Sequence, residues 1–498
     1  MMLAKSEVDE MKQAIDWSGK KVLVIGIARQ GIALARYLAQ HGARIIVNDR
    51  RQIDQLVDAQ GALRDEPVQW IVGGHPLSVL DGVDLVCISG GVPSDLPIVA
   101  EASKRGIPIS NDSQIFLEVC PCKVVGITGS AGKTTTTTLF GLIAQAAVDE
   151  LENASQERGE NSSGLSYIDY DSKVWVGGNI GSPLISVVDQ MQPDDLAVME
   201  LSSFQLEMMD RSPDVAVVLN ITPNHLDRHK TMENYIAAKS RIIEFQSSQD
   251  AAVLNLDDQV VSNLKDDING RLVAFSKQKI AENIPCVSFD PDFNSVQITS
   301  PKEQGEKQII VINHNDIPLR GEHNLMNVIA ACATALACGI SPTAMRSGVK
   351  KFSGIPHRLE FVRCWGGGDW YNDSIATAPE RAIAAIHSFS EPLILLAGGR
   401  DKDLPWDGFA SLVCERVKHL ILFGEAVGVI SAALNKYEKK SDITVTVCSG
   451  LLEGVKAAAT KVDEGDVVLL SPGGTSFDEF VDFEARGEAF KKWVMELV

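Results

Sequence analysis

The chain has 498 residues, of which 45% are hydrophobic and 22% are charged, ordinary values for a folded, soluble protein. At about 150 residues per domain, this length predicts about three domains. The formal net charge of −20 argues against a nucleic-acid partner, which requires a basic surface, and against adsorption to an anionic membrane. It does not exclude an anionic small ligand, because helix N-termini, metal ions and a few basic side chains act locally.

The cysteines and the apolar segments favour a cytoplasmic location. The nine cysteines are scattered along the chain, and Cys120 and Cys122 form C-P-C rather than C-x-x-C, so reduced thiols are expected. Residues 1–17 are charged throughout and do not resemble a signal peptide. The longest mostly apolar stretch, Val328 to Ile340, is too short to span a bilayer and predicts a buried helix.

Short β-branched runs recur along the whole chain, and each is followed by a glycine-containing turn and a helical pattern. This alternation predicts an α/β fold with parallel sheets and right-handed crossovers. The runs that predict strands are residues 20–26, 44–49, 84–89, 123–129, 215–220, 251–255, 392–399, 419–424 and 466–474.

Two predicted linkers divide the chain. One lies near Phe116–Lys123, and the other near Lys351–Arg358, where Gly354 and Pro356 interrupt regular structure. Residues 149–173 are polar and acidic, which predicts a surface insertion. The expected domains are residues 1–119, 120–354 and 355–498.

The first predicted domain imitates a dinucleotide-binding fingerprint. A strand runs into Gly26–Gly31, and the next strand ends in Asp49, an acid at the position that contacts a ribose or base. Ala28 stands where a glycine would let a pyrophosphate approach, so a redox cofactor is not favoured. Arg50 and Arg51 are positioned to meet a diphosphate instead. A Rossmann-like fold without a ligand is the alternative.

The strongest chemical signal is the run from Gly126 to Thr138, GITGSAGKTTTTT. Glycines let backbone N–H groups surround a phosphate, and the N-terminus of the following helix adds positive potential. In this pattern the lysine reaches the β- and γ-phosphates and the next hydroxyl ligates Mg²⁺. Ile127 replaces the first glycine of GxxxxGK[ST], so the form is GxxGxxGKT, and a plain strand–helix turn is the alternative. The predicted triphosphate site consists of Gly129, Ser130, Ala131, Gly132, Lys133, Thr134 and Thr135.

Polar residues also follow other predicted strands of the middle domain. Asn179 lies in G-G-N-I-G, Glu200 ends an apolar strand, His225 follows the strand at 215–220, and Lys239 lies in a helical pattern. Because strand-end loops of parallel sheets hold ligands, Glu200 and His225 are candidate Mg²⁺ ligands. Each residue alone also fits an ordinary structural role, such as a helix cap, a loop histidine or a solvated lysine. Their combination with the phosphate loop favours function.

These stretches, in this order, resemble the Mur ligase family, which builds the peptide stem of bacterial peptidoglycan by ATP-dependent amide formation. The resemblance implies a Rossmann-like N-terminal domain for a UDP-linked substrate, a central P-loop domain with a parallel sheet for ATP, and a Rossmann-like C-terminal domain for an amino acid. It covers nearly the whole chain, extending to residues 321–331, 354–360, 371–379, 397–406 and 471–490.

Within the family, three features favour the members that add D-glutamate. They are the Rossmann-like N-terminal unit, the stretch SPGGTSFDEFVDFEARG and the absence of a D-N-P-R motif. The implied reaction has two steps. The carboxylate of UDP-N-acetylmuramoyl-L-alanine attacks the γ-phosphate of ATP to give an acyl phosphate, and the amine of D-glutamate then displaces phosphate.

The resemblance assigns roles at matching positions. Lys133 and Thr134 would hold the ATP phosphates and Mg²⁺, while Glu200 and His225 would help to ligate two magnesium ions. Lys239 resembles the lysine that such ligases carbamylate with CO₂, which creates an anion able to position Mg²⁺. Further ATP positions are Asn324, Asn327, Arg358 and Asp373. The UDP-substrate positions are Arg29, Gln30, Arg50, Arg51, Gly91 and Asn179, and the D-glutamate positions are Thr377, Lys402, Ser476 and Phe483.

Two departures from the family pattern affect the expected amino-acid pocket. Ile375 stands where the family often has a lysine, and Arg400 and Asp401 form an extra charged pair before Lys402. The chain is therefore expected to be a cytoplasmic, monomeric ligase whose domains close about Gly354–Arg358, with small-molecule substrates and no nucleic-acid or membrane partner. A nicotinamide-dependent dehydrogenase and a non-catalytic nucleotide switch or regulatory ATPase are the competing interpretations. Ala28 and the triphosphate loop weigh against the first, and the second does not require the set of Glu200, His225 and Lys239.

Overall fold

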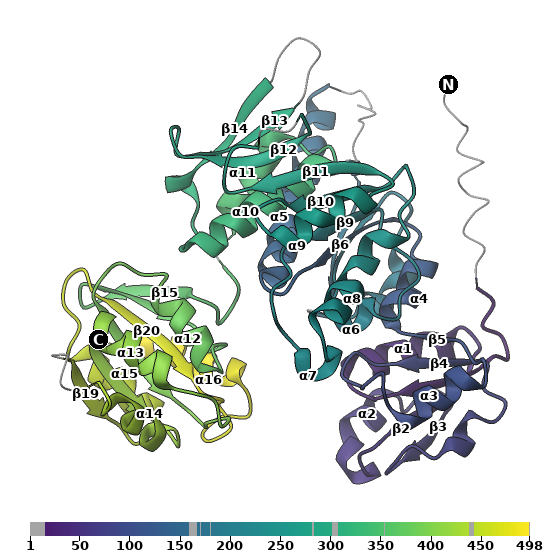
Figure 1. The fold of residues 1–498 in the computed structure, drawn as a ribbon, viewed down its shortest axis with the longest axis horizontal. Coiled ribbons are helices and arrows are strands. Elements are labelled where there is room, and N and C mark those ends of the chain that lie inside the picture. The colour runs from purple at the N-terminus through teal and green to yellow at the C-terminus, as the bar shows by residue number, and fades with distance from the viewer. Residues whose placement is uncertain are drawn as a thin grey trace. The chain divides into compact units, whose positions relative to one another are not determined.

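The computed structural model describes residues 15–158, 167–169, 171–179, 181–280, 283–300, 307–352, 354–437 and 443–497. They form three α/β sheets (Figure 1) in two compact units. The first unit is Met1–Asp316 with Met326–Lys351, and the second is Ile317–Leu325 with Phe352–Val498. The predicted α/β fold with three sheets is confirmed.

The N-terminal sheet is entirely parallel, with strand order β3-β2-β1-β4-β5. The chain order reverses between β1 and β4, so the loops that follow these two strands meet at the carboxyl edge of the sheet, where ligands bind in such folds. Its strands are β1 (Lys21–Ile25), β2 (Arg44–Asp49), β3 (Val68–Val72), β4 (Leu85–Ile88) and β5 (Ile109–Ser110), and its helices are α1 (Arg29–Gln40), α2 (Val57–Ala62), α3 (Pro97–Lys104) and α4 (Asp112–Val119).

The central sheet has nine strands in the order β14-β13-β12-β11-β10-β9-β6-β8-β7. Strands β6 to β12 run parallel, whereas β13 and β14 are antiparallel to their neighbours. Its strands are β6 (Lys123–Thr128), β7 (Val174–Gly178), β8 (Leu196–Glu200), β9 (Val215–Val218), β10 (Ala251–Asn255), β11 (Arg271–Ser276), β12 (Cys286–Asp290), β13 (Ser295–Ser300) and β14 (Lys307–Asn313).

The helices of this unit include the long α5 (Lys133–Arg158). The predicted buried helix is confirmed, because α10 (Glu322–Ala337) buries Val328 and most of the residues that follow it. The remaining helices are α6 (Ser203–Leu206), α7 (Leu226–His229), α8 (Met232–Glu244), α9 (Gln259–Asn263) and α11 (Pro342–Lys351). Among the described residues, no helix is long and apolar enough to cross a membrane.

Helix α5 corrects part of the predicted surface insertion at residues 149–173. The first ten residues of the predicted insertion, 149–158, belong to α5, which ends at Arg158. Residues 159–166 and 170 lie outside the described part of the chain. The helix is anchored on α11 by close contact, because a Cβ at Gly348 would lie 2.5 Å from the Cα of Ile143. An ion pair of 3.1 Å between Lys351 and Asp149 adds to this contact. The segment is polar here because one face of a helix meets solvent.

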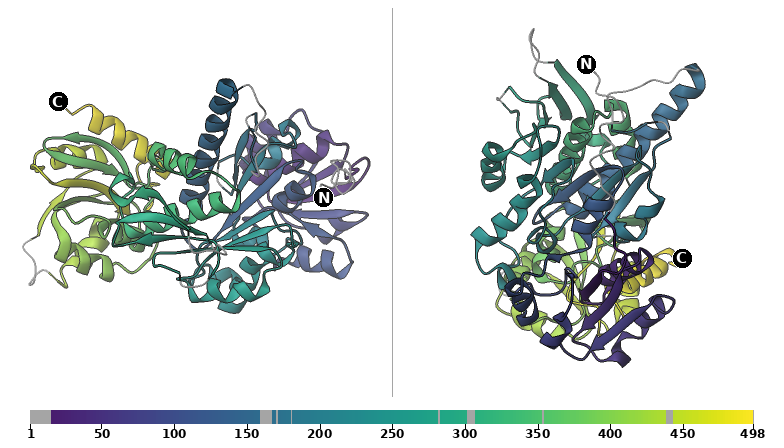
Figure 2. Two further views of the ribbon diagram at one scale, coloured as in Figure 1. Left: turned by 90° about the horizontal axis from the view of Figure 1, so that it is seen from above. Right: turned by 90° about the vertical axis from the view of Figure 1, so that its right-hand side faces the viewer.

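The sheet of the second unit has the order β15-β16-β20-β17-β18-β19, and only β15 is antiparallel. Two apolar clusters form its core, and helices cover both faces of the sheet (Figure 2). Its strands are β15 (Glu360–Trp365), β16 (Gly368–Asn372), β17 (Leu393–Gly398), β18 (Val417–Phe423), β19 (Thr444–Val447) and β20 (Val467–Gly473), and its helices are α12 (Pro379–Ile386), α13 (Asp407–Arg416), α14 (Val427–Leu434), α15 (Leu451–Ala459) and α16 (Phe483–Met495).

Candidate active site

The predicted phosphate loop connects β6 to α5 in a turn that requires glycine. Gly132 has φ +84°, and a Cβ there would lie 2.3 Å from Asn327 Oδ1. A Cβ at Gly129 would lie 2.9 Å from the Cβ of Leu219. Since α5 begins at Lys133, the N-terminus of this helix follows directly after the loop, which is the usual arrangement of a phosphate site.

Two side chains from neighbouring elements hold the loop in shape. The Asn220 side chain accepts a hydrogen bond from the Ala131 N–H at 2.8 Å and donates one to the Ala131 carbonyl at 3.1 Å. The hydroxyls of Ser130 and Tyr235 lie 2.9 Å apart. The Lys133 ammonium donates to the Gly129 carbonyl at 2.9 Å, so the lysine folds back over its own loop.

Glu200 lies at the carboxyl end of β8 and connects three of the predicted residues. Its Oε2 accepts a hydrogen bond from the Thr134 hydroxyl at 2.9 Å, and its Oε1 accepts one from the Asn179 amide at 2.9 Å. The Glu200 side chain is 2% exposed. A buried carboxylate beside a hydroxyl provides the oxygen donors that Mg²⁺ prefers, so these residues fit a magnesium ion.

Lys239, on α8, is buried, with only 1% of it exposed, which is unusual for a lysine. Its ammonium donates to the Gly129 carbonyl at 2.9 Å and to the Thr128 hydroxyl at 3.2 Å. Burial lowers the pKa of Lys239 well below its usual value, Lys133 lowers it further, and Glu200 opposes the shift. A neutral amine is the form that adds CO₂, so the surroundings of Lys239 fit the predicted carbamate.

His225 follows β9 and is exposed, with a left-handed backbone at φ 54°. Its ring meets the edge of the Phe204 ring at 5.2 Å between centroids. Within the described parts of the chain, no three His, Cys, Asp or Glu side chains form a group that would hold a metal. The metal-binding role of His225 therefore stays a prediction.

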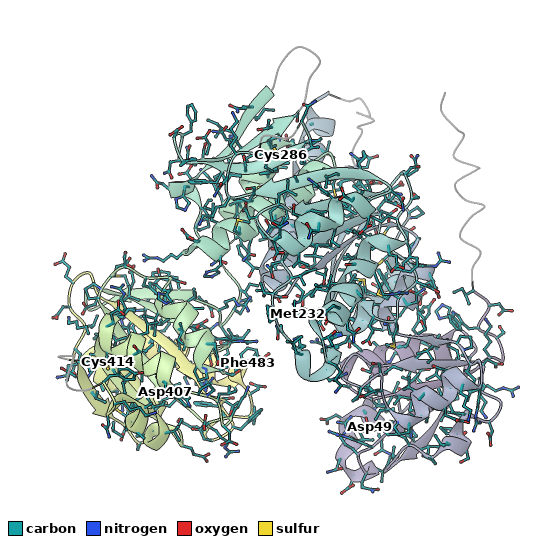
Figure 3. The ribbon with its side chains drawn as sticks, viewed as in Figure 1. Asp49, Met232, Cys286, Asp407, Cys414 and Phe483 are labelled. Carbon is teal, nitrogen blue, oxygen red and sulfur yellow. The ribbon has the colours of Figure 1, made fainter. Side chains whose placement is uncertain are left out.

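The fingerprint-like turn of the N-terminal domain is closed by an internal ion pair. Both oxygens of Asp49 are engaged, because Oδ2 accepts the Ile27 N–H at 2.9 Å and the Arg51 guanidinium donates to both oxygens. Burial opposes ionisation of Asp49, but the hydrogen bonds from Arg51 and Ile27 outweigh it and lower its pKa to about 2. Figure 3 labels Asp49 in this domain. Asp49 and Arg51 thus stabilise the turn in the absence of any ligand.

Other predicted UDP-substrate positions surround the same edge. Arg29, the first residue of α1, donates to the Asn179 carbonyl at 3.2 Å and so connects this domain to the residue that contacts Glu200. The Gln30 side chain lies against Gly90, where a Cβ would be 3.0 Å from its Oε1. Gly91 and Arg50 are exposed.

In the second unit, Asp373 follows β16 and is 4% exposed. It accepts hydrogen bonds from the Ser471 hydroxyl at 2.8 Å and the Leu359 N–H at 3.3 Å. Burial raises the pKa of Asp373 to about 7, although these hydrogen bonds and Arg358 oppose the shift. Burial and Arg358 also lower the pKa of His323.

The predicted D-glutamate positions lie on loops around β17 and β20. The Lys402 ammonium donates to the Thr377 hydroxyl at 3.4 Å, and partial burial, Arg381 and Arg486 lower its pKa. Ser476 is buried. Phe483, labelled in Figure 3, begins α16 and meets the ring of His357 edge-on at 6.1 Å.

The extra charged pair before Lys402 has partners of its own. Arg400 makes a two-pronged ion pair with Glu425, at 2.8 Å and 3.0 Å, and Asp401 accepts the indole N–H of Trp406 at 2.9 Å. These contacts stabilise the loop after β17. They give the pair a structural role that the sequence does not indicate.

Arg486 is a buried residue that the sequence reasoning did not single out. Its guanidinium, 0% exposed, donates to the Gly474 carbonyl at 3.1 Å and to the Ser374 carbonyl at 2.9 Å. Burial lowers the pKa of Arg486 to about 10. It ties together the loops that precede Thr377 and Ser476. Its position within E-A-R-G, inside the resembling stretch 471–490, is the signal that was present in the sequence.

The fold and the site define an α/β protein with a phosphate loop, and comparisons with known proteins agree with this class. The Mur ligase MurD-like N-terminal domain matches residues 20–111, the Mur ligase middle domain residues 127–335, and the Mur ligase glutamate ligase domain residues 357–474.

Two curated relatives match over nearly their full length. The chain is 36% identical over 493 residues to the UDP-N-acetylmuramoylalanine–D-glutamate ligase of Acetivibrio thermocellus, with 98% of both sequences covered. It is 37% identical over 482 residues to the protein of the same name from Symbiobacterium thermophilum, covering 96% of this chain and 98% of that one. The chain therefore belongs to the Mur ligase family, as the sequence resemblance predicts.

Solved structures agree on the fold. The chain matches UDP-N-acetylmuramate-alanine ligase MurC from Thermotoga maritima with a TM-score of 0.54 at 17% identity, covering 96% of this chain and 99% of that chain. It matches MurF from Acinetobacter baumannii with a TM-score of 0.54 at 18% identity, covering 96% and 91%. At these identities the similarity concerns the fold alone.

Proposed function

We propose that this protein is an ATP-dependent ligase that joins D-glutamate to UDP-N-acetylmuramoyl-L-alanine through an acyl phosphate. The observation that carries the proposal is the placement of buried Glu200 between the Thr134 hydroxyl and the Asn179 amide, beside a glycine-rich phosphate loop. The names of the relatives that match over nearly the full chain support the same substrates. The three domains at residues 1–119, 120–354 and 355–498 would hold the UDP-linked substrate, ATP and D-glutamate.

The first step transfers the γ-phosphoryl group of ATP to the substrate carboxylate. Such transfers depend on positioning and charge neutralisation more than on a protein nucleophile. The loop amides and Lys133 would hold the phosphates, with Lys133 leaving the Gly129 carbonyl to do so. Thr134 and Glu200 would hold magnesium, which neutralises the phosphate charge when it is bound.

Lys239 completes this arrangement as a carbamate. Its neutral amine adds to CO₂, so an N–C bond forms and one proton is released. The product would place an anion near Lys133 where the neutral amine stood, which adds an attractive charge and would supply an oxygen donor for a second magnesium ion. His225 would contribute to the same ion. Asn179 would contact the muramoyl substrate, with Arg29 at its other side.

In the second step the D-glutamate amine attacks the acyl carbon and phosphate leaves. Lys402, Thr377, Ser476 and Phe483 would hold D-glutamate, since a lysine paired with hydroxyls is suited to carboxylates. Excluding water protects the acyl phosphate from hydrolysis. We infer that the second unit closes for this purpose about Gly354–Arg358. We also infer that the enzyme is a cytoplasmic monomer, and analytical ultracentrifugation tests the monomeric state.

The test is phosphate release from ATP and Mg²⁺ with UDP-N-acetylmuramoyl-L-alanine, adding each amino acid in turn. D-Glutamate is expected to stimulate release, and stimulation by another amino acid alone would show that the proposed acceptor is wrong. For the carbamate, Lys239→Ala is expected to lose activity and to regain part of it with added short carboxylates. Full activity of the untreated variant would rule out the carbamate role.

A further inference from the structure

A row of cationic and aromatic side chains runs through the first unit from the N-terminal domain towards the phosphate loop. Arg228, on α7, donates to the Val92 carbonyl at 3.0 Å. Its guanidinium carbon lies 4.6 Å from the centre of the Phe204 ring, a cation–π distance. The Phe204 ring is parallel to the His229 ring, with 5.1 Å between centroids and an angle of 2°. Arg228 therefore contacts the N-terminal domain through its hydrogen bond to Val92 and the middle domain's Phe204 through its cation–π contact.

The row continues from His229 to the phosphate loop. The His229 ring lies 5.2 Å from the Tyr235 ring, and the Tyr235 hydroxyl lies 2.9 Å from the Ser130 hydroxyl. The Lys239 ammonium lies 5.0 Å from the centre of the Tyr235 ring. Burial lowers the pKa of His229, and its Nε2 lies 2.9 Å from the Ser203 hydroxyl. Burial thus favours the neutral imidazole, and its contact with Ser203 orients the ring between the two aromatic rings.

At its other end, the row reaches the glycine turn of the N-terminal domain. Gly26 has φ +88°, and a Cβ there would lie 2.4 Å from Val92 Cγ2. The Val92 N–H donates to the Ser89 carbonyl at 2.8 Å, which closes the loop after β4. The Val92 side chain therefore packs on the turn between β1 and α1, while its carbonyl is held by Arg228.

Helix α7 is a four-residue turn between two unusual backbone conformations. His225 before it has φ 54° and Lys230 after it has φ 70°. Such conformations of non-glycine residues cost of the order of 1–3 kcal/mol each and persist only where the surroundings hold them. The contacts of Arg228 with Val92 and Phe204 contribute to holding this turn, and the Arg228 N–H donates to the His225 carbonyl at 3.0 Å, which links His225 to the loop of the N-terminal domain.

We propose that Arg228 is a positioning residue that couples the loop Gly90–Val92 to the phosphate loop through Phe204, His229 and Tyr235. The inference rests on the proposed function, which puts the UDP-linked substrate beside the first loop and ATP beside the second. Each ligand stabilises the same arrangement of the row, and so each raises the affinity of the full chain for the other.

Calorimetric titration of the full chain tests this coupling. The Kd of a non-hydrolysable ATP analogue with Mg²⁺ is measured with and without saturating UDP-N-acetylmuramoyl-L-alanine. The wild type is expected to bind the analogue about fivefold or more tightly in the presence of the substrate. Arg228→Ala is expected to reduce this ratio to below about twofold. The Kd of each ligand measured in the absence of the other is expected to change much less. Arg211→Ala, which removes an exposed arginine of the same domain, is the matched control and keeps the ratio.

Two further variants separate coupling from folding. Phe204→Leu keeps apolar volume but removes the ring that Arg228 and His229 contact, and it is expected to lose the ratio as Arg228→Ala does. Arg228→Lys keeps the charge but not the planar guanidinium, so an intermediate ratio is expected. If Arg228→Ala is too unstable to titrate, these two variants decide the result.

Three outcomes overturn the coupling. They are a wild-type ratio near one, a wild-type ratio in the Arg228 and Phe204 variants, and loss of the ratio in the Arg211→Ala control. If the wild type does not bind the UDP-linked substrate at all, the proposed function fails and the coupling fails with it. Binding of both ligands without mutual effect overturns the coupling and leaves the proposed function standing.

Discussion

The Thr134 hydroxyl donates a hydrogen bond to Glu200 Oε2 at 2.9 Å and so ties the first turn of α5 to the end of β8. The other oxygen of the same carboxylate accepts the Asn179 amide. The two donors thus fix the orientation of the carboxylate before any ligand binds. Such preorganisation lowers the reorganisation needed for phosphoryl transfer.

Glu200→Gln is expected to reduce phosphate release about 100-fold or more and to raise the Mg²⁺ concentration needed for half-maximal activity. Glutamine keeps one acceptor oxygen, so it can accept the hydrogen bond of only one of the two donors, Thr134 or Asn179, and one negative charge is lost. The leftover buried donor also costs about 1–3 kcal/mol of stability. Glu207→Gln, at an exposed position shortly after β8, is the control. An unchanged Mg²⁺ dependence in Glu200→Gln would contradict the assignment of this carboxylate.

Lys239→Met is expected to abolish activity and yet to raise the free energy of unfolding at pH 7. The native pKa of Lys239 lies well below that of an unfolded lysine, about 10.4. Between these two values the unfolded state binds more protons, so wild-type stability rises with pH. The advantage of the variant therefore shrinks from pH 7 to pH 10.

Urea unfolding in CO₂-free buffer at pH 7, 8.5 and 10 measures this trend. Lys104→Met, which removes an exposed lysine of α3, controls for the substitution itself. A Lys239→Met protein that is less stable than the wild type at pH 7 would show that burial of the amine is not the dominant cost.

Asp373→Asn is expected to remove a dependence of stability on pH whose sign is opposite to that caused by Lys239. In the wild type, Asp373 makes the stability fall as the pH rises. The native pKa of Asp373 is about 7, against about 3.9 for an unfolded aspartate. Its protonated form is thus favoured by folding, and this stability is fully present below pH 4 and is lost as the pH rises towards 7. The slope is at most about 1.4 kcal/mol per pH unit.

Thermal unfolding between pH 5 and pH 8 detects this difference. The variant should gain stability relative to the wild type as the pH rises. Asp403→Asn suits the control, because Asp403 is exposed and has φ 57°, which asparagine tolerates. Parallel pH profiles of wild type and Asp373→Asn would contradict the raised pKa.

Arg486→Met is expected to cost about 3–5 kcal/mol, because it leaves the carbonyls of Ser374 and Gly474 buried without donors. Since those loops lead to Thr377 and Ser476, the KM for D-glutamate should rise more than the KM for ATP. Chemical unfolding and initial rates measure the two effects. Lys492→Met, on an exposed site of the same helix, should change neither, and an equal rise of both KM values would contradict a local role.

The sequence predicts best those features that depend on short, contiguous patterns. The phosphate loop is visible because glycine, lysine and threonine occur in one run, and Glu200 because it ends an apolar strand. The structure brings Thr134, Asn179 and Glu200 together, as expected for residues at the carboxyl ends of parallel strands.

What the sequence does not predict depends on which strands and side chains the folded chain brings into contact. Strands β11 to β14 extend the central sheet without the strand–turn–helix pattern that marks the others. The ion pair of Asp49 with Arg51 depends on local side-chain geometry, and the burial of Arg486 depends on two loops from elsewhere in the chain. A charged residue in a sequence favours the surface by default, so only the structure reveals such partners.

Helix α5 carries Lys133 and Thr134 at one end, and it is fastened at several points before it reaches Arg158. A Cβ at Gly141 would lie 2.6 Å from Val176 Cγ2, Gly348 lies against Ile143, and Asp149 pairs with Lys351. Residues inserted after Arg158 would follow all of these contacts in the sequence. The end of this helix is therefore a suitable position for a fluorescent label or an inserted tag that reports on the enzyme without displacing its phosphate loop.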